Sequence, residues 1–164
     1  MSLAPLLRGL VLRITLDSDH SLDNLNHVID TREALDRSVG DELARIYEGQ
    51  PVDHLHRIVQ AMRDRNNAGE SFAQEDHRFH ATLLEPLGNP LIKEISEALW
   101  KVHMQVLPLL DLSMPEDIEL TIESHADMID ALVADDPALY REVVTRHYEP
   151  LRRLVGAAAA RHGR

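Results

Sequence analysis

The chain contains no cysteine, few aromatic residues and no long apolar run. Without cysteine it has no disulfide framework, no thiol nucleophile and no thiolate zinc site, so a bound metal ion would have to use His, Asp or Glu. No apolar run approaches the ~20 residues that a transmembrane helix needs. The apolar stretch at 3–16 is interrupted by Arg8 and Arg13, and no small-residue cleavage site of a signal peptide follows it. We therefore expect a cytoplasmic protein without a membrane partner.

Basic residues are also scarce. The 164 residues include 17 Lys and Arg against 28 Asp and Glu, which gives a formal net charge of -11. Binding to a phosphate backbone depends on neutralisation by Lys and Arg, so this balance argues against the chain binding nucleic acid by itself. A composition of 44% apolar and 27% charged residues is ordinary for a soluble globular protein. The length suits one domain.

Apolar residues recur at steps of three and four along most of the chain, which predicts an all-α fold, an antiparallel bundle of about six helices. Residues 1–21 form a lead-in segment without a clear pattern, either a short strand or a short helix, and residues 22–164 form the helical domain. The first predicted helix runs unbroken from Ser21 to the turn at residues 49–51. Capping boxes at Ser71 and Ser113 and prolines in the first turn mark later helix starts, at Pro51, Ser71, Pro90, Ser113 and Pro137.

Asp76 and His80 are the first polar pair of interest. They are four residues apart, so on a helix they occupy one face, and that face continues into Leu83 and Leu84. A buried polar group without a partner costs ~1 to 3 kcal/mol. The pair also has the spacing of two ligands of one metal ion, and the rest of the chain must supply their partner.

Two more histidines lie on apolar faces. His125 stands among Ile122, Met128 and Ile129, and His147 stands between Val144 and Leu151. A lone inward histidine is more often a core residue that is hydrogen-bonded to a carbonyl group. Four groups of ligand type on three helices instead favour a divalent ion, either Zn, Ni, Mn or Fe, with Zn most favoured. Because each imidazole must be neutral to bind, metal affinity should fall as the pH drops through the histidine range.

The remaining polar candidates are fewer. His103 lies between Leu99 and Val106 and is the next candidate, either as a ligand or as a residue that hydrogen-bonds one. Arg32 falls on an apolar helix face, where an isolated charge needs a partner. His77 points to the side of its helix, and the other histidines are interpreted as surface or unassigned residues: His20, His27, His54, His56 and His162.

Several motifs together resemble a known family. In chain order, these motifs are Arg32-x-x-Leu35-Asp36, Asp76-x-x-Phe79-His80, Leu83, Gly88-Asn89-x-Leu91, His125 and His147. Together they resemble the FadR-type C-terminal (FCD) domain of GntR-family bacterial transcription regulators. The resemblance extends from about Leu22 to the end of the chain. Pro86, Tyr140 and Arg141 depart from the family's usual pattern.

The resemblance implies an effector-binding and dimerisation domain. The metal ligands would be Asp76, His80, His125 and His147. A small carboxylic acid, the effector, would occupy the open positions of the ion. Arg32 would bind that effector, with His103 as a second candidate. A homodimer would be the functional unit. DNA would be reached through a winged helix-turn-helix, for which residues 1–21 are too short.

Three hypotheses follow from these residues. The first is the metal-dependent, carboxylate-sensing domain of a transcription regulator, which is not an enzyme. The second is a mononuclear metal hydrolase or lyase in a helical bundle, because a metal ion with an open position can activate water. The third is a structural bundle whose buried acid and imidazoles hydrogen-bond one another.

Overall fold

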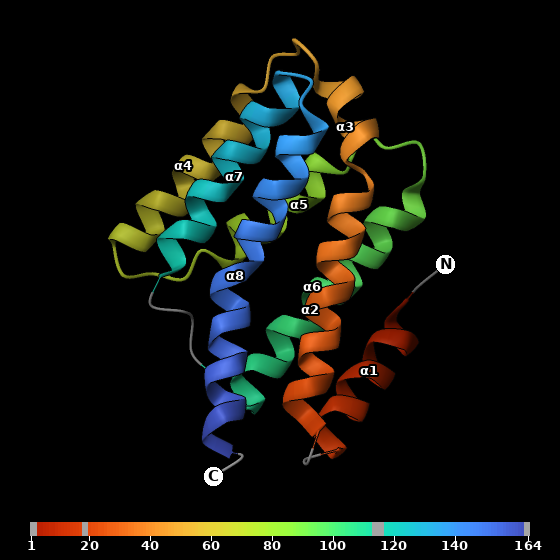
Figure 1. The fold of residues 1–164 in the computed structure, drawn as a ribbon, viewed down its shortest axis with the longest axis vertical. Helices are drawn as coiled ribbons and strands as arrows, with labels where there is room; N and C mark the ends of the chain where they lie inside the picture. The colour runs from red at the N-terminus through yellow and green to blue at the C-terminus, as the bar shows by residue number, and fades with distance from the viewer. Residues whose placement is uncertain (1–2, 18–19, 113–116, 163–164) are drawn as a thin grey trace.

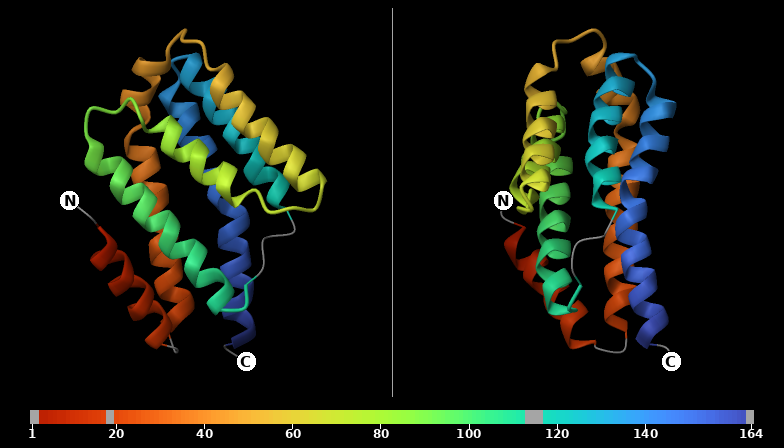
Figure 2. Two further views of the ribbon diagram at one scale, coloured as in Figure 1. Left: turned by 180° about the vertical axis from the view of Figure 1, so that it is seen from behind. Right: turned by 90° about the vertical axis from the view of Figure 1, so that its left-hand side faces the viewer.

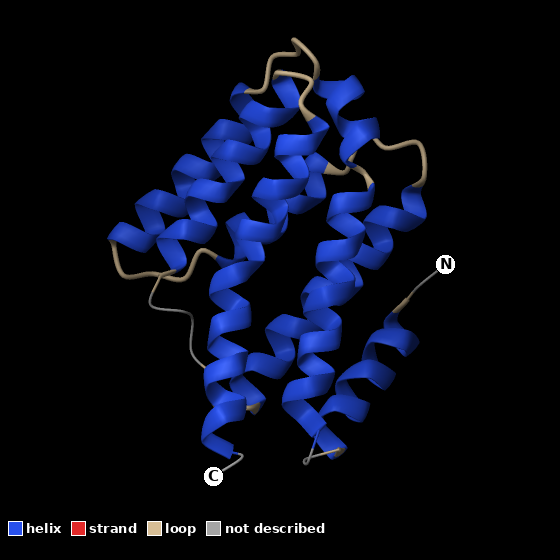
Figure 3. Cartoon of the chain, viewed as in Figure 1, coloured by secondary structure: helices blue, strands red, loops and turns tan. Residues whose placement is uncertain are grey.

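The computed structural model describes residues 3–17, 20–112 and 117–162, and this part of the chain is all-helical, without a strand (Figures 1 and 3). The predicted helix start at Ser113 lies outside the described residues. The helices are α1 (Ala4–Leu16), α2 (Ser21–Ser38), α3 (Gly40–Tyr47), α4 (Asp53–Asn67), α5 (Ala73–Leu83), α6 (Pro90–Leu109), α7 (Ile118–Val133) and α8 (Pro137–His162). In this described part, no helix is both long and apolar enough to cross a membrane.

The helix count differs from the predicted six in two places, and the first is the lead-in segment. Residues 4–16 form α1, which packs against α6 and α2. Ile14 is buried, and Leu7, Leu10 and Val11 are partly buried against the core. These four positions have the three- and four-residue spacing of one apolar helix face. In the sequence, this spacing is obscured because apolar and polar residues also alternate in this segment. The lead-in is therefore part of the packed structure.

The second difference is a break in the predicted first helix. The helix ends at Ser38 and resumes at Gly40, with Val39 between α2 and α3. Gly40 is buried against Tyr140, and a Cβ atom at Gly40 would lie 3.0 Å from Cδ1 of that ring. The missing side chain therefore lets α8 approach this junction closely, and the bulky Tyr140 is accommodated there.

The helices form two layers, which are seen edge-on in the right-hand view of Figure 2. One layer contains α1, α4, α5 and α6, and the other contains α2, α3, α7 and α8. The layers contact each other mainly where α4 meets α7 and where α2 meets α6. The apolar core fills the space between them. Polar side chains that α5 directs toward α7 and α8 therefore point between the layers.

Local capping contacts fix the position of α5. Gly69, with φ of 70°, ends α4, and Glu70 N donates to Arg65 O at 2.9 Å. This is a Schellman motif. The predicted capping box at Ser71 does not form, because Phe72 occupies the N-cap and Ser71 Oγ accepts from Ala73 N.

The other end of α5 is tied to the opposite layer. The helix ends at Leu83, three residues before Pro86, and the hydroxyl of Tyr47 donates to Leu83 O at 3.0 Å. Burial raises the pKa of Tyr47 to about 12, so the hydroxyl stays a donor. Asn89 then caps α6, since its side chain accepts from Leu91 N, and the helix begins at Pro90 as predicted. The short α5 is thus held at both ends.

Candidate metal centre

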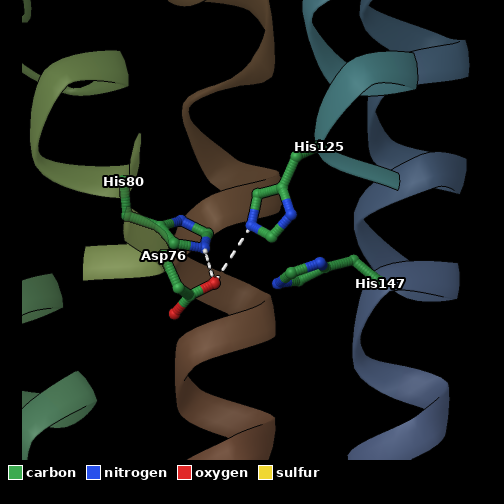
Figure 4. Close-up of side chains that lie close together, drawn as sticks. All are labelled: Asp76, His80, His125 and His147. Atoms are coloured by element: carbon green, nitrogen blue, oxygen red, sulfur yellow. Dashed lines mark ion pairs between the residues drawn. The ribbon is translucent and has the colours of Figure 1, made fainter. Parts of the chain in front are cut away.

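Four side chains of ligand type meet between the two layers. They are Asp76 and His80 from α5, His125 from α7 and His147 from α8. One potential ligand atom from each residue lies within 4.8 Å of those of the other three. Figure 4 shows the imidazoles converging on the Asp76 carboxylate from three helices. The structure therefore brings together all four residues that were predicted as metal ligands.

The distances leave most of the imidazole nitrogens without a hydrogen bond. Asp76 Oδ1 lies 3.1 Å from His125 Nε2 and 3.7 Å from His80 Nε2. Neither approach has hydrogen-bond geometry. Four ring nitrogens are buried without a hydrogen-bond partner among the described residues: Nε2 of His80, Nδ1 and Nε2 of His125, and Nδ1 of His147. Mutual satisfaction of acid and imidazoles would leave fewer such atoms, so the geometry argues against a purely structural cluster.

A divalent cation fits this donor set. Three imidazoles and one carboxylate on four separate side chains suit Zn in particular, and also Ni, Mn or Fe. An ion binds one ring nitrogen of each imidazole, so it would give a partner to part of the unpaired nitrogens and remove a desolvation cost of ~1 to 3 kcal/mol for each of these that it binds. The burial of the cluster, with His125 fully inaccessible to solvent, makes this gain larger than it would be at the surface.

The protonation states are those that metal binding requires. Burial lowers the pKa of His80 to about 4, although the Asp76 and Asp36 carboxylates oppose this shift. Burial and the neighbouring imidazoles also hold the pKa of His147 well below its usual range. Burial by itself would raise the pKa of Asp76, but the surrounding imidazoles lower it well below the ordinary value. At neutral pH His80 and His147 are thus neutral and the Asp76 carboxylate is ionised.

The same shifts predict that the metal-free protein loses stability in mild acid. Unfolded imidazoles take up protons as the pH falls through 6.5, whereas folded His80 stays neutral until about pH 4. The unfolded state then binds more protons, so the free energy of unfolding falls between these values. From pH 7 to 5 the loss should be about 2 kcal/mol for each imidazole that stays neutral. Urea unfolding of chelator-treated protein, followed by circular dichroism, measures it.

His27→Ala is the matched control for this experiment, because His27 is exposed and its removal should leave the pH dependence unchanged. An unfolding free energy that stays constant from pH 7 to 5 would contradict the prediction. This range avoids the titration of most surface carboxylates.

Trp100 orients the carboxylate of the cluster. Its indole Nε1 donates to Asp76 Oδ2 at 2.6 Å, while Oδ1 faces the histidines. The Trp100 ring also lies against His77, with ring centroids 4.7 Å apart. Sequence reasoning did not identify Trp100, although it is the sole tryptophan of a chain with few aromatics. An N–H donor that holds one oxygen leaves the other for a metal ion.

Replacing Trp100 by phenylalanine should weaken metal binding about 10- to 100-fold, the usual effect of removing a group that hydrogen-bonds a ligand. Phenylalanine keeps an aromatic ring beside His77 and removes the N–H donor. Competition with a metal-chelating dye measures the change. Equal affinities in the two proteins would show that Trp100 has only a packing role. In the wild type, the fluorescence of this tryptophan should change on metal loading.

A second pair of aromatic and acidic residues supports the site from α2 and α8. The hydroxyl of Tyr148 donates to Asp36 Oδ2 at 2.6 Å, and the same oxygen lies 4.0 Å from His80 Nδ1. Asp36 is therefore the acid that faces the outer side of the His80 ring. Its position one helical turn after Arg32 and its place in the family-like motif were the available signals. Tyr148 gave no signal beyond its position next to His147.

Arg32 lies beside the cluster without an acidic partner. It is 4% exposed, and its Nη1 lies 2.6 Å from His103 Nδ1. Burial and the Arg32 charge lower the pKa of His103 to about 3, so the neutral ring accepts from the guanidinium. The Arg32 guanidinium carbon stands 5.3 Å from the centroid of the Tyr148 ring. No carboxylate of the described residues lies within 4.0 Å of Arg32, so its charge is available to an anion.

A pocket joins Arg32 to the cluster. Its polar lining comes from Arg32, Asp76, His103, His147 and Tyr148, and the rest of its wall is mostly apolar. Its empty volume, including the part open to solvent, is about 540 Å³. His103 thus lies in the pocket beside Arg32 and outside the four-residue cluster.

Five of the other histidines have side chains that the structure describes. His20, His27, His54 and His56 are exposed, and His77 is half-buried. The side chain of His162 lies outside the described residues. The candidate site therefore includes four of the ten histidines, all of which are buried.

Comparisons with known proteins agree with the family resemblance of the sequence motifs. Residues 27–150 match the model of the FCD domain. NedR of Micromonospora viridifaciens, which is named as a transcriptional regulatory protein, is 36% identical over 115 residues, and these cover 70% of this chain and 82% of NedR. No solved structure matches the chain. These similarities indicate a regulatory rather than a catalytic protein.

Proposed function

Because the chain belongs to the FCD domain family, we propose that it is the effector-binding domain of a transcription regulator and that it senses a small carboxylic acid through a bound divalent metal ion. Asp76, His80, His125 and His147 would hold the ion, with Zn the best match to the donors. Arg32 would bind the effector, and His103 would position Arg32 for it.

The observation that carries this proposal is the unpaired charge of Arg32 in a pocket that adjoins the cluster. A buried guanidinium without an acid is costly, and an incoming carboxylate relieves that cost through charge-assisted, bidentate hydrogen bonds. A bound metal ion would add a second positive charge for the same anion. Guanidinium and ion together favour a carboxylate over a neutral ligand.

The position of the site suggests how binding is transmitted. Its residues come from α5 and α6 in one layer and from α2, α7 and α8 in the other. An effector held by both layers favours one packing of the layers over others, and by linkage any partner that prefers the same packing changes effector affinity. In the proposed regulator, the two copies of a homodimer would pass this change to attached winged helix-turn-helix domains, which carry the DNA contacts.

The proposal is tested by calorimetric titration of acetate, lactate, succinate and citrate into zinc-loaded protein and into chelator-treated protein. At least one acid should bind the loaded protein, and its affinity should fall by about tenfold or more after metal removal, since one of the two charges that hold it is gone. Elemental analysis of protein purified without a metal-affinity tag accompanies the titration. Absence of stoichiometric metal together with absence of acid binding would refute the proposal.

A further inference from the structure

The pocket has two chemically different parts. Its polar side chains are contiguous, because Arg32 contacts His103 and Tyr148, and the ring of Tyr148 lies 5.0 Å from that of His147. The remaining wall carries one hydroxyl, that of Thr121, and is otherwise formed by Phe72, Ala73, Met104, Leu107, Ile118 and Leu151. A ligand that is bound at the polar part must place the rest of its atoms against this apolar wall.

The charges of the lining fit one carboxylate. Arg32 is the one Lys or Arg residue that lines the pocket in the described part of the chain. In the proposed site Arg32 and the ion would both bind the first carboxylate, so a second carboxylate placed against the apolar wall would leave water with no cation beside it, which disfavours its binding. The hydroxyls of a sugar acid would lie against Leu, Ile and Met side chains, and each hydroxyl left without a hydrogen-bond partner there weakens binding. Both ligand types are therefore disfavoured.

The apolar wall favours a hydrocarbon tail. It is built from the start of α5 at Phe72 and from side chains of α6, α7 and α8, so it surrounds a ligand from several sides. Phe72 and Leu107 are buried, whereas Met104, Ile118 and Leu151 are half-buried and lie closer to solvent. Each methylene group that a ligand buries here should strengthen binding by ~0.8 kcal/mol, or about fourfold in Kd.

We infer that the effector is a monocarboxylate with an apolar tail, and that di- and tricarboxylates and sugar acids are selected against. This inference rests on the proposed function, because it assumes that Arg32 and the metal centre bind the carboxylate. It adds that specificity comes from the apolar wall, which contains no second cationic side chain among the described residues.

Matched acids test the inference. The affinities of acetate, butanoate and hexanoate for zinc-loaded protein should rise by about fourfold per methylene until the pocket is filled. Butanoate should bind at least tenfold more tightly than succinate, and hexanoate at least tenfold more tightly than adipate. If both members of each pair bind with equal affinity, or the diacid binds more tightly, the tail preference is wrong while the carboxylate-sensing function stands. If no acid binds, the proposed function itself fails.

A substitution in the wall gives an independent test. Met104→Lys introduces a second cation at a half-buried position, where its charged end can reach solvent. It should raise the affinity for adipate relative to hexanoate by at least tenfold over the wild-type ratio, whereas Met104→Leu should leave that ratio unchanged. An unchanged ratio in a folded Met104→Lys protein would overturn the assignment of this wall to the tail. Should that protein fail to fold, the matched acids with wild-type protein decide the question.

Discussion

Asp76→Asn is expected to lower the affinity for a divalent metal ion by more than about 100-fold, beyond the 10- to 100-fold range that is typical for residues that only support a ligand. Asparagine keeps the size of the side chain and an acceptor for the Trp100 indole. It removes the negative charge among three imidazoles, so the ion loses its one anionic ligand in the cluster. Competition with a chelating dye, in parallel with thermal unfolding, measures the effect.

Metal binding to the native state also determines the expected stability change. At a metal concentration a thousandfold above Kd, the wild type should gain about 4 kcal/mol of unfolding free energy from the ion, and Asp76→Asn should gain far less at the same concentration. His125→Gln should behave like Asp76→Asn. His27→Ala, on the surface, is the matched control and should bind metal like the wild type. Wild-type affinity in both cluster variants would remove these residues from the metal site.

Arg32→Met is expected to have opposite effects on ligand binding and on stability. Carboxylate affinity should fall by about 30-fold or more, because truncating one partner of a buried charge pair typically costs 2 to 5 kcal/mol. The free energy of unfolding of the effector-free protein should stay equal or rise, because an apolar side chain of similar length no longer buries a charge without an acid. Calorimetric titration and urea unfolding measure the two quantities.

A surface arginine supplies the control for this experiment. Arg57 is exposed, and Arg57→Met should change neither carboxylate affinity nor unfolding free energy by more than about 0.5 kcal/mol. If Arg32→Met binds the acid as tightly as the wild type, the pocket arginine does not hold the effector. If it strongly destabilises the effector-free protein instead, the contacts of Arg32 with His103 and Tyr148 serve the fold rather than the ligand.

The sequence predicted the helical class well because the apolar period is a local property. The helix starts expected at Pro90 and Pro137 are confirmed as the first residues of α6 and α8, and the side chains of Asn89 and Asp136 cap these two helices. The prediction from sequence failed where contacts between distant residues override the local pattern. The break at Val39 lies next to Gly40, against which the distant Tyr140 packs, and α1 packs against α6 and α2. Both features involve contacts between residues that are far apart in the chain.

By itself, then, the sequence determined an all-helical domain of the FCD family and the inward orientation of Arg32, Asp76, His80, His125 and His147. Helical periodicity sets the face on which a residue lies, and a charged or ionisable group on a buried face needs a partner. Their roles as metal ligands and effector anchor remain predictions.

The tertiary structure alone decided which groups meet. It placed the four ligand-type residues within 4.8 Å of one another, the Trp100 indole on Asp76, the Tyr148 hydroxyl on Asp36, and an apolar wall opposite Arg32. The physical reason is that these contacts depend on the depth and rotation of helices in two packed layers, which are fixed by interlocking side chains from the whole core and not by any one segment.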